Sequence, residues 1–331
     1  MRKVKNIISI RNKKDLRTRS WDIVFEWENI IAQKLNLNIV EKKGSFFFFF
    51  MQRLHLSKAF NLLFRSSHLS LEFVTDVKLK ANSYASCNTI PIIIDFWYEK
   101  DEEIIKFIEH FKYVPLLFVT NKEVQTLLSS YVCPFAVEHF PLSLPDQYKL
   151  QDSSITKGKE YEFGFVGRID NFFWELIQKY AERHEDFEYV YSKGISVERE
   201  FWTNKGRYLG KDEGRESYIN FLRKTKISSY STPGMDETKK VKYNQVTPRL
   251  LEMLANGCQV IGHYPLSDDV IWYNLPSVVK SVENYEDFEK ELDSLRKKDF
   301  DFDKVSGFLS RHYTSSSVLL LSEALNKHSL I

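Results

Sequence analysis

The stretch TPRLLEMLANGCQVIG, residues 247–262, predicts a short helix followed by a buried strand. Thr247 is a residue type that caps helix N-termini, and Pro248 suits the first helical position, where a missing N–H costs nothing. Asn256-Gly257 is typical of a left-handed helix end. The predicted helix therefore spans about 248–256. Its sharply defined N-terminus combines free N–H groups with the positive end of the helix dipole, which together make an anion site.

Two charged side chains on this helix suggest which ligand would bring an anionic group to this site. Arg249 adds a forked guanidinium to the first turn, which suits a phosphate group. Glu252 follows three residues later on the same helix face, where a carboxylate can accept hydrogen bonds from two ribose hydroxyls. The alternative is a surface Arg–Glu pair on a helix that is capped for stability. A long basic loop before the helix, with Lys239, Lys240 and Lys242, favours a ligand.

A second phosphate candidate is the turn Gly167-Arg168, which follows the strand-like segment FGFV. In an open parallel sheet, ligands bind beyond the carboxyl ends of the strands. The turn and the start of the helix both follow strand-like segments. We therefore predict that they meet at this edge of one sheet.

The whole chain alternates strand-like and helix-like segments, which predicts parallel sheets with helices on both faces. Its 331 residues suit two domains of about 150 residues each. The first half includes VKNIISI, SFFFFFM and IPIIIDFW, and a second series starts at YEFGFVGRID. Residues 135–160 lose this periodicity and hold the connection. The predicted parts are an N-terminal domain at 1–145, a linker at 146–160, a C-terminal domain at 161–312, and a final helix at 313–331 that packs back toward the N-terminal domain.

Composition is that of a soluble globular protein, with 43% apolar and 28% charged residues. The run Phe46–Met51 is far shorter than the ~20 residues that span a bilayer. Three cysteines lie far apart, without metal-ligand spacing, which fits a reducing compartment. No signal peptide is recognisable at the N-terminus. We therefore expect a cytoplasmic protein.

Taken in order, FGFVGRID and TPRLLEMLANGCQVIG resemble the GT-B glycosyltransferases, namely the group-1-like enzymes and their spore-maturation-type relatives. The resemblance covers about 160–265 and is only architectural elsewhere. It implies an α/β fold of two Rossmann-like domains facing across a cleft. It also implies that Gly167 and Arg168 face the donor diphosphate, that Thr247, Pro248 and Arg249 form the phosphate-binding helix start, and that Glu252 holds the donor ribose.

This sequence departs from the family pattern at two places. Many members carry another glutamate eight residues before the Glu252 position, and here that residue is Asn244. The lysine that often follows the Val-Gly-Arg turn is also absent, with Asn171-Phe172-Phe173-Trp174 in its place. The Lys239–Lys242 cluster or Arg207 could substitute for it. Whether transfer retains or inverts the anomeric configuration stays open.

The resemblance implies no metal and no cofactor beyond the activated donor. A DxD match at Asp301-Phe302-Asp303 falls at the start of a predicted helix, so we interpret its carboxylates as capping charges. The sequence contains no P-loop, no zinc-ligand spacing and no nucleophile elbow.

The predicted acceptor side lies in the first half of the chain. Residues 1–20 hold eight Lys/Arg against Asp15 alone, and such a patch can attract nucleic acid, anionic lipid or a phosphorylated ligand, or be a solvated terminus. Of these, Arg11, Arg17 and Arg19 follow the first strand and are candidates for contact with the acceptor or a membrane. Asp95 follows IPIII and is the candidate catalytic base, and the alternative is a carboxylate that caps a helix or lies in a loop. His55, His68 and His139 are further candidates.

We therefore predict a metal-independent glycosyltransferase that moves a sugar from an activated, nucleotide-linked donor to a glycan acceptor, in bacterial surface polysaccharide biosynthesis. The expected partners are the donor, a glycan or lipid-linked glycan, and the inner face of the membrane, but no nucleic acid. The alternatives are a nucleotide-sugar epimerase on the same fold and a non-catalytic glycan-binding subunit.

Overall fold

A computed structural model describes residues 2–11, 20–42, 59, 61, 63, 65–75, 77, 79, 84–165, 167, 169–194, 199–236 and 242–331. These residues form two compact units. Unit 1 holds the described parts of 2–11, 23–142 and 314–331, and unit 2 holds 20–22 and those of 143–313. The predicted linker, 146–160, belongs to unit 2 and contains the 3₁₀ turns Asp146–Tyr148 and Ser153–Thr156.

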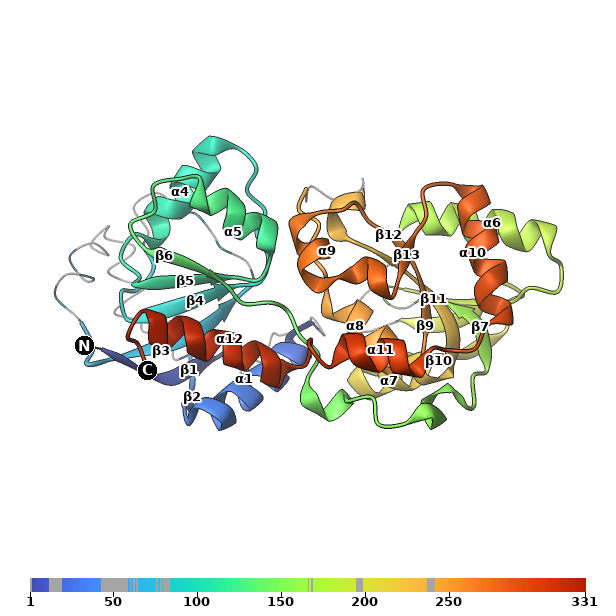
Figure 1. Cartoon of the computed structure of the whole chain (residues 1–331), viewed down its shortest axis with the longest axis horizontal. Coiled ribbons are helices and arrows are strands. Elements are labelled where there is room, and N and C mark those ends of the chain that lie inside the picture. The colour runs from blue at the N-terminus through green and yellow to red at the C-terminus, as the bar shows by residue number, and fades with distance from the viewer. Residues whose placement is uncertain are drawn as a thin grey trace. The chain divides into compact units, whose positions relative to one another are not determined.

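Unit 1 is built on a parallel sheet with strand order β2-β1-β3-β4-β5-β6. The strands are β1 (Lys3–Ser9), β2 (Asn38–Glu41), β3 (His68–Val74), β4 (Thr89–Ile93), β5 (Leu116–Val119) and β6 (Ala136–His139). The helices are α1 (Ser20–Leu35), α4 (Asp101–Phe111), α5 (Lys122–Ser129) and α12 (Thr314–Lys327). In Figure 1, α4 and α5 cover one face of this sheet, and α1 and α12 cover the other.

The structure adds two strands to those predicted for unit 1. β3 was not predicted, and β6 lies inside the stretch that was interpreted as a connection. β3 alternates buried and less buried residues, as expected for a strand with one face in the core. The predicted strand SFFFFFM lies outside the described residues.

Unit 2 is built on a sheet with strand order β10-β9-β8-β7-β11-β12-β13. The strands are β7 (Tyr161–Gly164), β8 (Tyr189–Lys193), β9 (Glu200–Thr203), β10 (Tyr208–Lys211), β11 (Thr225–Ser231), β12 (Gln259–His263) and β13 (Lys280–Ser281). The helices are α6 (Asn171–Arg183), α7 (Arg215–Lys224), α8 (Pro248–Ala255), α9 (Asp268–Tyr273), α10 (Tyr285–Lys297) and α11 (Phe302–Leu309).

One edge of the unit 2 sheet is not parallel. β8, β9 and β10 pair antiparallel, whereas the other neighbouring strands pair parallel. We did not predict β9 and β10. The residue that could have indicated this pair of strands in the sequence is Gly206. It lies in the turn between β9 and β10 and has a φ of 83°. Such a left-handed glycine is typical of a β-hairpin loop.

Two hydrophobic cores cover the faces of the unit 2 sheet. One joins α7, α8, α9 and α11 to the sheet through residues such as Leu222, Leu251 and Phe308. The other joins α6 and α10 through residues such as Phe173, Ile177 and Phe288. Because both faces are covered, ligands reach this sheet at the ends of its strands.

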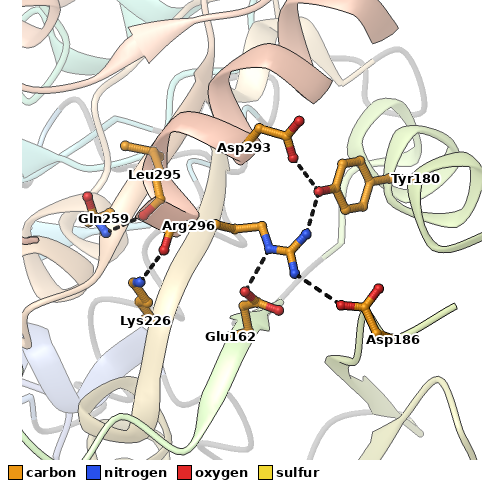
Figure 2. Close-up of polar contacts among 8 residues, drawn as sticks. All are labelled: Glu162, Tyr180, Asp186, Lys226, Gln259, Asp293, Leu295 and Arg296. Carbon is orange, nitrogen blue, oxygen red and sulfur yellow. Dashed lines mark hydrogen bonds and ion pairs between the residues drawn. The ribbon is translucent and has the colours of Figure 1, made fainter. Parts of the chain in front are cut away.

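Polar contacts of Arg296 fix the C-terminal end of α10 (Figure 2). Its Nε donates to Glu162 Oε1 at 2.7 Å, and its NH1 donates to the hydroxyl of Tyr180 at 2.8 Å. That hydroxyl donates to Asp293 at 2.5 Å. Burial and the neighbouring Asp293 raise the pKa of Tyr180 to about 12. The carboxylate of Asp186 is 3.7 Å from Arg296 and 80% exposed, so it contributes little.

Backbone carbonyls at the end of α10 tie the same helix to two strands. Lys226 of β11 donates to the carbonyl of Arg296 at 2.6 Å, and Gln259 of β12 donates to that of Leu295 at 3.0 Å (Figure 2). Lys226, Gln259 and Glu162 all lie at the amino ends of their strands. This network is therefore on the edge of the sheet opposite to the carboxyl ends, and we assign it a structural role.

Replacing Arg296 with methionine keeps the aliphatic stem but removes the donors to Glu162 and Tyr180. Charge-assisted hydrogen bonds contribute about 1.5–3 kcal/mol, so we expect the free energy of unfolding to fall by about 2 kcal/mol. Urea denaturation measures this. The exposed neighbour Lys297, changed to methionine, is the control and should alter stability by less than about 0.5 kcal/mol. Equal stability of the two variants would mean that the network contributes nothing.

Candidate functional site

The N-terminus of α8 is held in place by residues from other elements. Thr247 occupies the N-cap position with extended backbone, but its side chain makes no capping hydrogen bond. Its backbone N–H instead donates to the hydroxyl of Tyr230 on β11 at 2.9 Å. The N–H of Val246 donates to Asp269 Oδ2 of α9 at 2.6 Å, and Asp269 is fully buried. The predicted helix start is correct, but tertiary contacts rather than the predicted cap position it.

Gly167 and Arg249 come together at the carboxyl edge of the unit 2 sheet. Gly167 follows β7 with a φ of 77°, a conformation that favours glycine. A Cβ on this residue would lie 3.4 Å from NH1 of Arg249, so the turn and the guanidinium are close neighbours. The Arg249 guanidinium also lies 6.0 Å from the centre of the Tyr230 ring. Arg168, the other residue of the turn, is outside the described residues.

Glu252 is buried and not on an exposed helix face, with only 4% of the residue accessible. Its Oε2 accepts a hydrogen bond from the hydroxyl of Tyr218 at 2.8 Å, and its Oε1 forms an ion pair with Arg215. Both partners come from α7. Burial, and next the charge of Glu252, raise the pKa of Tyr218 well above its usual value. The carboxylate thus has two protein partners before any ligand binds.

The structure describes Asn244, which stands in place of the family glutamate, and two of the residues considered as substitutes for the missing lysine, Arg207 and Lys242. Asn244 accepts a hydrogen bond from Thr232 at 2.7 Å through its side-chain oxygen. Arg207 pairs with Glu188 at 2.9 Å, and its side chain is 58% exposed. Lys242 is exposed, and Lys239 and Lys240 lie outside the described residues.

A polar cluster that we did not predict lies at the same edge of the sheet. Asp170 caps α6, its side chain accepting from the N–H of Phe172 at 3.1 Å. Its Oδ2 lies 3.8 Å from Nδ1 of His263, the last residue of β12. Ser231, the last residue of β11, is the register partner of His263. The available sequence signal was the polar residue that ends each of the two strands.

Arg11, predicted to contact the acceptor, binds within unit 1. Its NH2 donates to Glu28 at 2.8 Å and to Asn29 at 3.0 Å, and its Nε donates to Ser9 at 3.1 Å. Glu28 is 1% exposed, and its burial raises its pKa despite the neighbouring Arg11 and Ser9. Arg11 therefore offsets a buried carboxylate. Arg17 and Arg19 lie outside the described residues.

The predicted acid–base candidates of unit 1 differ in their surroundings. Asp95 is half-buried and follows β4 at the carboxyl end of the strand. His139 ends β6, and burial lowers its pKa to about 3, which keeps the imidazole neutral. His68 starts β3 and is exposed at the opposite edge of the sheet. His55 lies outside the described residues.

Three further sequence expectations can be compared with the structure. Asp301 caps α11, its side chain accepting from the N–H of Lys304 at 3.0 Å, which confirms its interpretation as a capping charge. Among the described residues, no three His, Cys, Asp or Glu side chains group as metal ligands. In the same part of the chain, every helix is too short or too polar to cross a membrane.

No family model matches the sequence, and no curated protein matches it at a significant level. Solved structures do match. A sucrose-phosphate synthase from Thermosynechococcus elongatus aligns over 98% of this chain and 99% of its own, with a TM-score of 0.59 and 9% identity. A DNA-modifying β-glucosyltransferase aligns over 99% and 100%, with a TM-score of 0.52 and 11% identity.

A third match is a putative UDP-N-acetylglucosamine 2-epimerase from Listeria monocytogenes. It aligns over 99% of this chain and 97% of its own, with a TM-score of 0.51 and 11% identity. At such identities the likeness concerns the fold alone. The two α/β units, each with helices around a mostly or wholly parallel sheet, are those of the matched glycosyltransferases. The chain therefore has the GT-B fold that the sequence resemblance implied.

Proposed function

We propose that this chain is a glycosyltransferase that moves a sugar from a nucleotide-linked donor to a glycan acceptor. The observation that carries the proposal is the approach of Arg249 to Gly167 at the N-terminus of α8. A forked cation, a helix N-terminus and a glycine turn meet there at the carboxyl ends of parallel strands. This combination suits a diphosphate group.

Each predicted donor residue then has a role. Arg249 and the helix start at Thr247 and Pro248 bind the diphosphate, with Arg168 as a second cation. Positive groups fixed in position stabilise the charge that develops on the leaving diphosphate. Glu252 binds the ribose hydroxyls, for which it exchanges its contact with Arg215, whose side chain is 20% exposed.

The acceptor in this proposal is a glycan or a lipid-linked glycan of a bacterial surface polysaccharide, met at the inner face of the membrane. Arg17 and Arg19 contact it or the anionic surface. Asp95, half-buried after β4, accepts the proton of the attacking hydroxyl.

Three outcomes of one experiment separate the candidate functions. The chain is incubated with UDP-, GDP- and ADP-linked sugars without acceptor, and the products are identified. Slow release of free sugar and nucleoside diphosphate supports the glycosyltransferase. An isomerised nucleotide sugar supports an epimerase, the activity named for the Listeria structure. Donor binding without any turnover, even with glycan acceptors present, supports a binding subunit and contradicts the proposal.

A strong chelator should leave the transfer rate unchanged. The reason is that Arg249 and the N-terminus of α8 supply the positive charge at the proposed diphosphate site. The rate is measured before and after dialysis against EDTA, with and without added Mg²⁺ or Mn²⁺. A rate that falls to background and returns with either ion would contradict a metal-independent site.

A further inference from the structure

The polar cluster of Asp170, Ser231 and His263 has three buried side-chain atoms that make no hydrogen bond of normal length, although they neighbour one another. Oδ2 of Asp170, Oγ of Ser231 and Nδ1 of His263 are each buried without a hydrogen bond. Buried polar atoms are nearly always hydrogen-bonded, so three together require an explanation. They lie where β11 and β12 end and α6 begins, which is the ligand-binding edge of the sheet.

The charge in this cluster resides on Asp170. Burial acts to raise the pKa of Asp170, but His263, Ser231 and the N–H of Phe172 outweigh burial and lower it. Asp170 Oδ2 and His263 Nδ1 are 3.8 Å apart, which is less than 1 Å longer than the usual N···O distance of a hydrogen bond. A small closure therefore lets Nδ1–H donate to the carboxylate, which fixes one proton on Nδ1.

With Nδ1 turned toward Asp170, the other ring nitrogen is available for a ligand. Phe172 stacks on the imidazole with the ring centres 3.8 Å apart and the planes within 16°, which holds the ring in place. Of the two ring nitrogens, only Nδ1 is both sealed from solvent and without a partner. The same turn that leads to Asp170 carries Gly167, the neighbour of Arg249.

We propose that His263, oriented by Asp170, is a further contact for the donor diphosphate, with Nε2–H donating to a phosphoryl oxygen. This inference rests on the proposed function, because it takes the donor to carry a diphosphate. Asp170 Oδ2 lies 3.8 Å from the imidazole, and Arg249 and Asp269 are further charged side chains at this edge. A phosphate group bound at Nε2 adds negative charge beside the ring, and a nearby negative charge favours the protonated form of an imidazole.

The proposal predicts that donor binding is linked to uptake of one proton. Binding of UDP, GDP and ADP to the full chain is measured by titration calorimetry at pH 6 and pH 8, in buffers of different ionisation enthalpy. Wild type should bind more tightly at pH 6 and take up a proton at pH 8. His263→Gln should lose about 10-fold in affinity at pH 6, because a charge-assisted hydrogen bond is removed. It should also lose the proton uptake.

Two further variants keep the test independent of folding. Asp170→Asn retains an oxygen to cap α6 but removes the charge, so proton uptake should fall while the melting temperature stays close to wild type. His184→Gln changes an imidazole at the opposite end of α6 and is the matched control, which should bind like wild type. The ionisation of the nucleotide phosphate is common to all variants and cancels in the comparison.

Two results would overturn the inference, and they have different consequences for the proposed function. If His263→Gln binds nucleotide with the affinity and proton uptake of wild type, His263 is not a phosphate contact, and the proposed function still stands. If wild type binds no nucleoside diphosphate at either pH, the nucleotide-linked donor itself is wrong, and the inference fails with it.

Discussion

We expect Arg249→Ala to lower kcat and to raise the donor KM, so that kcat/KM falls by about 10- to 150-fold. That range corresponds to the roughly 1.5–3 kcal/mol of a charge-assisted hydrogen bond. Both parameters change because the contact is present in the bound donor and strengthens as charge builds on the leaving group. Initial-rate kinetics with varied donor, at saturating acceptor, measure the two effects separately.

The control for Arg249 is Arg223, an exposed arginine on α7. Arg223→Ala should leave both parameters at the wild-type value. Arg249→Lys keeps the charge but not the fork, so it should recover only part of the loss. If a folded Arg249→Ala protein has wild-type kinetics, the proposed binding of phosphate at the N-terminus of α8 is wrong.

Glu252→Ala should lower the free energy of unfolding by about 3 kcal/mol, the lower end of the range for breaking a buried ion pair. The lower end applies because Arg215 is 20% exposed and can regain some solvent contact. The hydroxyl of Tyr218 also loses its acceptor. Urea denaturation measures the change, and Glu216→Ala, an exposed carboxylate on α7, should be near neutral.

Glu252→Gln separates stability from ribose binding. The amide oxygen still accepts from Tyr218, so this variant should be more stable than Glu252→Ala. If Glu252 also binds the donor ribose, Glu252→Gln should weaken binding of UDP but not of inorganic pyrophosphate, which has no ribose. Equal affinities of wild type and Glu252→Gln for both ligands would leave Glu252 with its structural role alone.

Some parts of the fold could be predicted because their signals are local. The helix predicted at about 248–256 is α8, which spans Pro248–Ala255. The buried strand predicted after it is β12, Gln259–His263. Hydrophobic periodicity, caps and glycines act over a few residues, so they can be read without knowing the fold.

Strands with weak local signals were missed. β10 is the edge strand of the unit 2 sheet, β9 is its neighbour, and each has four residues of which one is charged. Charged residues are common where an edge must resist pairing with another chain. β6 is a short edge strand as well, and its four residues gave no alternation strong enough to separate it from the connection that follows.

The candidate site also combines features that local sequence signals predict with features that they do not. The sequence by itself determined the turn at Gly167, the sharp start of α8 and the cation on its first turn, because each depends on the backbone preferences of neighbouring residues. Only the tertiary structure decided which side chains meet. It joined Glu252 to Arg215 and Tyr218 of α7, and it placed His263 beside Asp170. Such pairs form between residues far apart in the chain, and their distances are fixed by how helices pack on the sheet, which no local pattern encodes.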